Sequence, residues 1–181
     1  MPEPLIHFII PFFLLLMSGL NVKKAILFSM LAILPDLDVL FHIHRSFSHS
    51  IIFILLISAL AAIVIKKFYK EKFHGSIIAT LVILSHPFMD AFTGYTPVFW
   101  PLFNKSILIV AELTTNMNDV LDINLNLDMY FKPVIFYKTT NIDTPIFSST
   151  GVAVSLVLLA GLALKYYSIK HYSLKPPSFR P

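Results

Sequence analysis

The sequence has no cysteine among its 181 residues and few charged side chains. The lack of cysteine excludes disulfides, thiolate nucleophiles, and cysteine-ligated zinc or iron–sulfur clusters. Only 13% of the residues are Asp, Glu, Lys or Arg, whereas a soluble domain has about a quarter. Apolar residues make up 56%, and the mean hydropathy is +0.77. This composition predicts a multi-pass protein of the cell membrane.

Five apolar runs approach or reach the roughly 20 residues that a membrane-spanning helix needs. They cover approximately residues 5–20, 25–41, 47–65, 75–92 and 145–164. Prolines at positions 11, 35 and 87 interrupt three of these runs. In a membrane such prolines free backbone carbonyls, which are tolerated where they line a polar cavity. We therefore expect an all-α integral membrane protein with about five transmembrane helices.

Residues 93–144, between the fourth and fifth runs, are less apolar than the runs around them. Within them, LDINLNLDM at 121–129 alternates apolar and polar side chains, which is the period of a β-strand. Residues 105–113 and 133–138 also fit short strands. We predict one membrane domain over residues 1–165 with this loop outside the membrane, followed by a basic, disordered cytoplasmic tail at 166–181.

The basic residues predict the orientation. Ten of the 14 Lys and Arg residues fall in three segments, at 23–24, 66–72 and 165–180. If these segments face the cytoplasm, five crossings place the N-terminus outside and the C-terminus inside, in accord with the positive-inside rule. The net charge of +4 is then explained by membrane orientation, so we expect no nucleic-acid partner.

One stretch, LPDLDVLFHIHRSFSHS at residues 34–50, is rich in ionisable groups although apolar runs flank it. Such groups at the edge of hydrocarbon are costly to desolvate, so they usually have a partner or a function. Five crossings bring this stretch to the same membrane face as His7, His86 and Asp90. His86 and Asp90 are four residues apart, and therefore share one face of a helix.

Carboxylates and imidazoles that converge in this way favour a divalent metal, because neighbouring carboxylates repel unless a cation neutralises them. Oxygen and nitrogen ligands without sulfur fit Zn²⁺ best, with Mn²⁺ or Fe as alternatives. A metal of this kind activates water and polarises a phosphoryl oxygen. The predicted ligands are Asp36, Asp38, His44, His49, His86, Asp90 and His7.

Arg45 and Asp38 are the predicted catalytic residues, and Arg45 would hold the anionic group of a phosphoester. We interpret Ser48 and Ser50 as helix N-caps rather than nucleophiles, and His42 as an interfacial side chain. Two other functions stay open. The same ionisable groups could line the path of a divalent cation or proton transporter, or form a purely structural polar network that holds helices together.

The order of the motifs resembles the LexA-regulated, membrane-bound, metal-dependent hydrolases of the YdjM-like family. The similar motifs are LPDLD at 34–38, HR at 44–45, SHS at 48–50, SHPFMD at 85–90 and FWPL at 99–102, with His7 near the N-terminus. Ser48 stands where the family has threonine, and Pro87 follows the downstream histidine. The resemblance implies a membrane hydrolase with phospholipase-like activity that acts on a membrane lipid or another phosphoester.

Overall fold

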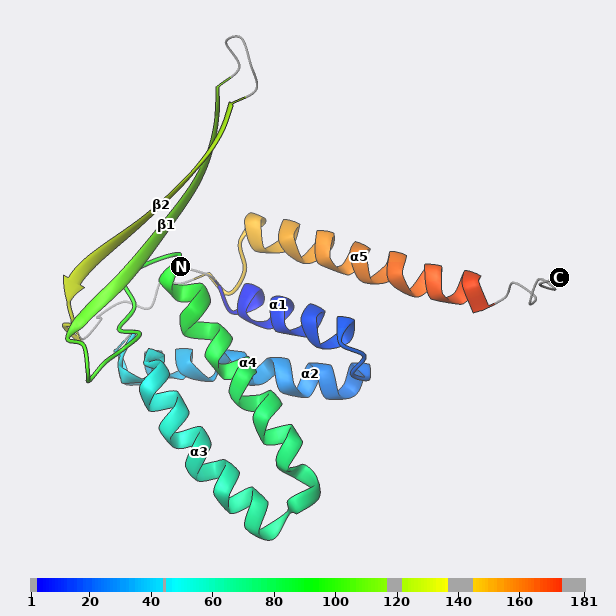
Figure 1. The fold of residues 1–181 in the computed structure, drawn as a ribbon, viewed down its shortest axis with the longest axis horizontal. Helices are drawn as coiled ribbons and strands as arrows, with labels where there is room; N and C mark the ends of the chain where they lie inside the picture. Colours follow the sequence, from blue (N-terminus) through cyan, green and yellow to red (C-terminus); the bar gives the residue numbers. More distant parts are fainter. Residues whose placement is uncertain (1–2, 44, 117–121, 137–144, 174–181) are drawn as a thin grey trace.

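The structure, a computed structural model, describes residues 3–43, 45–116, 122–136 and 145–173. The helical elements are α1 (Pro4–Met17), α2 (Val22–Met30), the 3₁₀ helices η1 (Leu31–Phe41), η2 (Phe47–His49) and η3 (Lys70–Lys72), α3 (Ile51–Phe68), α4 (Phe73–Ala91) and α5 (Ser149–Ser173). Strands β1 (Lys105–Asn116) and β2 (Asp122–Pro133) form one antiparallel hairpin (Figure 1).

Two helices of the described chain are long and apolar enough to cross a membrane. They are α3, with a mean hydropathy of 2.5, and the part of α5 from Ser149 to Ser168, with 1.6. Helix α1 is apolar but has only 14 residues. The second predicted run is divided between α2 and η1. The protein is thus mostly helical as expected, while five crossings and the orientation of the termini stay predictions.

Two of the expected local structures differ from those observed, whereas Pro87 leaves α4 continuous from Phe73 to Ala91. Residues 134–136 are not a strand, although β1 and β2 confirm the strands expected in this loop. Helix α5 extends beyond residue 165 to Ser173, into the tail that we expected to be disordered, and residues 174–181 lie outside the described residues.

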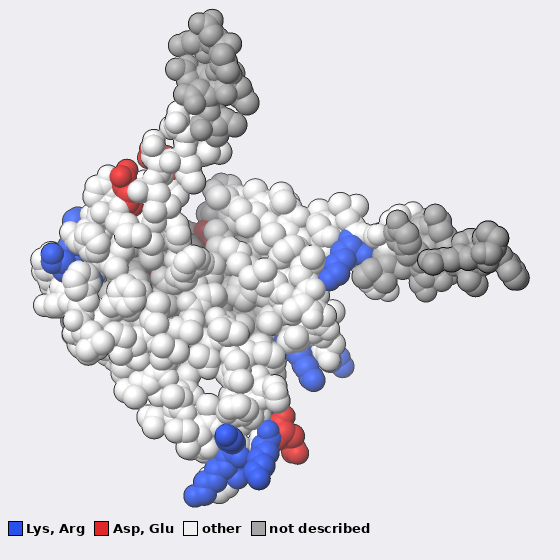
Figure 2. Space-filling model, in the orientation of Figure 1, with Lys and Arg blue, Asp and Glu red and all other residues white. Residues whose placement is uncertain are grey.

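The polar and the basic residues gather at opposite ends of the helices. Helices α1 and α3 begin, and α4 ends, near the stretch around residues 34–50, which we call the site end. The α3–α4 turn, with its lysines, lies at the other end, and Lys165 Nζ donates to the Met17 carbonyl 2.9 Å away. Figure 2 shows basic side chains of this end as blue groups at the lower edge, beside a red group, and to the right, while a further blue group and red groups lie on the left of the surface. The lysines of residues 66–72 thus lie at the end of the helices opposite the stretch around residues 34–50.

The segment that carries the central motif is not an α-helix. Residues Leu31–Phe41 form a 3₁₀ helix that contains Pro35 and ends at His42, whose φ is 56°. Arg45 also has a positive φ, of 55°. Non-glycine residues adopt this left-handed conformation rarely, and it turns the chain sharply. The turn brings Ser46 N within 2.9 Å of Asp38 Oδ2, and η2 then leads into α3.

Candidate metal centre

Four side chains from three elements converge at the site end. Asp36 comes from η1, His49 from η2, and His86 and Asp90 from α4. One oxygen or nitrogen atom of each lies within 4.8 Å of the others. Three of the four side chains are buried: His49 and His86 are 0% exposed and Asp90 is 1% exposed.

The spacing of these atoms fits the ligands of one metal ion. Asp36 Oδ1 lies 3.5 Å from His49 Nε2 and 3.4 Å from His86 Nε2. The two Nε2 atoms are 3.1 Å apart, and Asp90 Oδ2 lies 3.3 Å from that of His49 and 3.9 Å from that of His86. Ligands about 2.0–2.1 Å from a tetrahedral zinc are roughly 3.4 Å apart. The four residues can therefore hold a divalent metal, and their spacing does not identify which one.

The orientation of His86 is fixed by a backbone carbonyl. Its Nδ1 donates to the Ala32 carbonyl oxygen over 2.7 Å. In a 3₁₀ helix that carbonyl would accept from the amide of residue 35, but Pro35 has no N–H to donate. Proline thus frees the acceptor that holds the imidazole. Because Nδ1 carries the proton, the lone pair of a neutral His86 is on Nε2 and points at the cluster.

His49 is oriented in the same way by side chains. Its Nδ1 lies 3.4 Å from Asp38 Oδ2 and 3.1 Å from Ser48 Oγ, while Ser48 Oγ lies 3.0 Å from the same carboxylate oxygen. The carboxylate is itself held by the Ser46 amide, which donates over 2.9 Å. This pattern of a carboxylate behind a histidine is typical of metal ligands. Nε2 of His49 is therefore also directed at the cluster.

The surroundings of His49, which lies in the short turn before α3, favour a positive charge. Burial would lower the pKa of its imidazole, but hydrogen bonds with Asp36, Asp38 and Asp90 raise this pKa to about 10. Two imidazole lone pairs and two carboxylates meet here, and they repel one another unless a cation lies between them. A bound proton can supply this positive charge, and a divalent metal would displace the proton.

Substitution of Asp38 by asparagine should weaken metal binding without removing the ligands. An amide cannot supply the negative charge that holds Nδ1–H of His49, so the imidazole loses its fixed tautomer. We expect metal affinity to fall about 10–100-fold, as for other residues behind a metal ligand. The measurement is a chelator competition titration on the purified protein. Asp128→Asn, which changes an exposed carboxylate on the hairpin, is the matched control and should leave the affinity unchanged.

Arg45 lies at the edge of the cluster. Its Nε is 3.2 Å from Asp90 Oδ2, and its Nη2 donates to Thr93 Oγ1 over 3.2 Å. Nε and Oδ2 lack the alignment of a hydrogen bond, and neither of these two buried atoms makes a hydrogen bond within the described chain. Gly94 packs against the guanidinium so closely that a Cβ there would overlap Arg45 Nη1. The arginine is thus held beside Asp90, at the edge of the four donors.

His7 joins the same cluster from α1. It is fully buried, stacks on the His86 ring at a centroid distance of 3.8 Å, and its Nε2 lies 3.5 Å from Asp90 Oδ1. Neither of its ring nitrogens makes a hydrogen bond within the described chain. His7 therefore faces the carboxylate oxygen of Asp90 that does not face His49.

The predicted site residues do not all lie in the same place. Asp36, His49, His86 and Asp90 meet at one point, and His7 and Arg45 adjoin them through Asp90. Asp38 lies behind His49 rather than among the four donors. His44 lies outside the described residues.

The sequence prediction missed several supporting groups. Ser50 does cap α3, accepting from the Phe53 amide as expected, but Ser48 contacts Asp38 and His49 instead. The Ala32 carbonyl and Thr93 were not singled out. A proline three residues after Ala32 was the one available signal for the carbonyl, and the SHS motif was the signal for Ser48.

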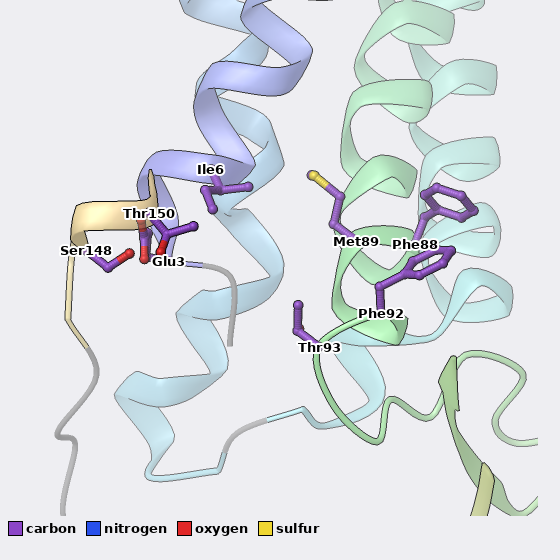
Figure 3. Close-up of a pocket in the computed structure, with 8 residues that line it drawn as sticks. All are labelled: Glu3, Ile6, Phe88, Met89, Phe92, Thr93, Ser148 and Thr150. Atoms are coloured by element: carbon purple, nitrogen blue, oxygen red, sulfur yellow. The ribbon is translucent and has the colours of Figure 1, made fainter. Parts of the chain in front are cut away.

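A mostly apolar cavity of about 520 Å³ lies between the end of α4 and the starts of α1 and α5. Thr93, which accepts a hydrogen bond from Arg45, is one of its lining residues. Figure 3 shows Ile6 and Met89 on opposite sides of it, with Thr93 at its edge. Glu3, Ser148 and Thr150 form its polar side. The cavity thus adjoins Arg45 through Thr93.

Comparison with known proteins identifies a family. A family model described as YdjM inner membrane protein matches residues 4–172. No curated protein and no solved structure matches the chain.

Proposed function

The chain belongs to the YdjM inner membrane protein family, and from this premise we propose that it is a metal-dependent hydrolase that cleaves a lipid or another phosphoester at the membrane surface. The observation that carries the proposal is that the Nε2 atoms of His49 and His86 meet two carboxylates at one point. The Nδ1 atoms of both rings are already held, by Asp38 for His49 and by the Ala32 carbonyl for His86. A purely structural network would not need both lone pairs to point at the same place.

Each residue has a distinct part in this proposal. Asp36, His49, His86 and Asp90 hold the metal, which would supply an acidified water ligand and polarise a phosphoryl oxygen. Asp38 positions His49. Arg45, fixed by Thr93, binds the phosphoryl oxygens and stabilises the charge that develops on them. His7, on the other side of Asp90, is a further ligand in this scheme.

The distribution of buried charge argues against a transporter. A transport path needs ionisable or polar groups along its whole length. Within the described residues, the buried ionisable groups are Glu3, His7, Asp38, His49, His86 and Asp90, and all lie at the site end. Towards the basic end, the described buried residues include Ala25, Ser29 and Ser76, of which only the two serines are polar and none is ionisable.

Metal removal and replacement test the proposal. The full-length protein, purified in detergent, should contain a divalent metal by elemental analysis, and should hydrolyse glycerophospholipid vesicles or a chromogenic phosphodiester. Chelation should abolish the hydrolysis, and Zn²⁺ or Mn²⁺ should restore it. Protein that holds its metal but cleaves neither substrate under any of these conditions would contradict the hydrolase assignment. Metal-dependent uptake into proteoliposomes would support transport instead.

A further inference from the structure

The β-hairpin has one apolar and one polar face. In its register Ile107 pairs with Phe131, Ile109 with Met129, Ala111 with Leu127, and Leu113 with Leu125. Paired residues and their second neighbours point to the same side of a two-stranded sheet, so all eight lie on one face, the apolar face. The opposite face carries most of the polar residues, including Ser106, Glu112, Asn124, Asn126, Asp128 and Lys132.

The apolar face is covered only near its base. Ile107 is 8% exposed and packs with Ala91 and Val98 in a small core. Further along the strands, Leu127 is 56% exposed and Leu125 is 68% exposed. A two-stranded hairpin is marginally stable in water by itself, and a long, exposed apolar face usually marks an interaction surface. Something outside this chain is therefore expected to cover it.

A groove continues the apolar face towards the helices. Its volume is about 540 Å³, and every residue that lines it is apolar. Its walls include Ile51 at the start of α3, Phe88 near the end of α4, and Met129 and Phe131 from the hairpin. Phe88 also lines the cavity beside Thr93, so the two hollows adjoin the same part of α4.

The direction of the hairpin points to lipid as the partner. Figure 1 shows the strands leaving the site end and running across the directions of α1 and α5, rather than continuing them. The base of the apolar face packs on the end of α4. This face is therefore turned towards the helices and not away from them. In a protein of the inner membrane, that side is the bilayer. The acidic groups Glu112 and Asp128 lie on the other face, towards water.

We propose that the hairpin lies on the membrane surface at the site end, with acyl chains against its apolar face and one chain in the groove at its base. The hairpin then forms an interfacial lipid-binding surface beside the metal centre. This inference does not depend on hydrolysis, because it rests on the register, exposure and direction of the strands, on the apolar groove and on the membrane location of the family.

The absence of cysteine allows a direct test with the full-length protein in vesicles. Leu125→Cys and Leu127→Cys place a single thiol on the apolar face, and Asn124→Cys and Asn126→Cys place one on the polar face. Each is labelled with a bimane fluorophore and exposed to lipids brominated on their acyl chains, or to iodide in the water. A helical circular dichroism spectrum at the wild-type level checks that each variant is folded.

Brominated lipid should quench the two leucine-site labels severalfold more strongly than the two asparagine-site labels, and iodide should show the reverse order. Equal quenching of all four labels by iodide would overturn the proposal, because the hairpin would then stand free in water. Leucine-site labels shielded from both quenchers would also overturn it, since a protein, such as a second copy of the chain, would then cover the face. Neither result would bear on metal content or hydrolysis.

Discussion

His86→Ala should remove the bound metal from the purified protein and abolish hydrolysis. His86 Nε2 is within 3.9 Å of donor atoms from Asp36, His49 and Asp90, so its loss opens the centre of the cluster. The remaining carboxylates would also lose an imidazole neighbour and repel each other more strongly. We expect metal content to fall to the background of the elemental analysis, with no measurable phosphodiester cleavage on return of Zn²⁺ at the wild-type dose.

The chain offers a matched control on the same helix. His74, at the opposite end of α4, is exposed and lies outside the cluster. His74→Ala should keep both metal and activity. Circular dichroism on both variants checks that α4 is retained. If His86→Ala kept the wild-type metal content with an intact helical spectrum, the proposed metal centre would be incorrect.

The sequence predicted which residues meet because helix crossings constrain the ends of helices strongly. If the first four apolar runs alternate across a bilayer, as the sequence predicts, the start of α1, the start of α3 and the end of α4 come to one face. His7, His49 and Asp90 then lie on that face, whatever the details of packing. The i, i+4 spacing of His86 and Asp90 placed them on one side of α4, and Pro87 did not disturb this. These features depend only on periodicity and on the number of crossings.

The division of roles within the 34–50 stretch could not be predicted in the same way. Asp36 and Asp38 are two residues apart, and only the 3₁₀ geometry of η1 and the turn at His42 decide that Asp36 faces His86 while Asp38 faces Nδ1 of His49. The left-handed conformations of His42 and Arg45 have no signature in side-chain pattern, because they arise from the tertiary contacts around the turn. The hairpin is also longer than predicted, because β1 continues to Asn116 and β2 to Pro133.

Arg45→Lys should separate substrate binding from metal binding. Lysine keeps the positive charge near Asp90, so the metal ligands stay paired and metal content should remain at the wild-type level. It cannot contact Asp90 and Thr93 and still present a fork of donors to a phosphoryl group, because its ammonium is a single point charge. We expect kcat/KM to fall by about 10²-fold, the lower range for the loss of one donor that stabilises a developing oxyanion.

A glycine substitution tests the same role without changing Arg45 itself. A methyl group at Gly94 would overlap the guanidinium, which must then move because it is the free end of a flexible side chain. Gly94→Ala should therefore lower kcat/KM in the same direction as Arg45→Lys, again with metal content retained. Gly161→Ala, where the added methyl would meet Phe13 at an ordinary 3.7 Å, should change neither quantity. Because the overlap moves only the guanidinium, full activity in both Gly94→Ala and Arg45→Lys would mean that Arg45 serves the structure around Asp90 and does not bind the substrate.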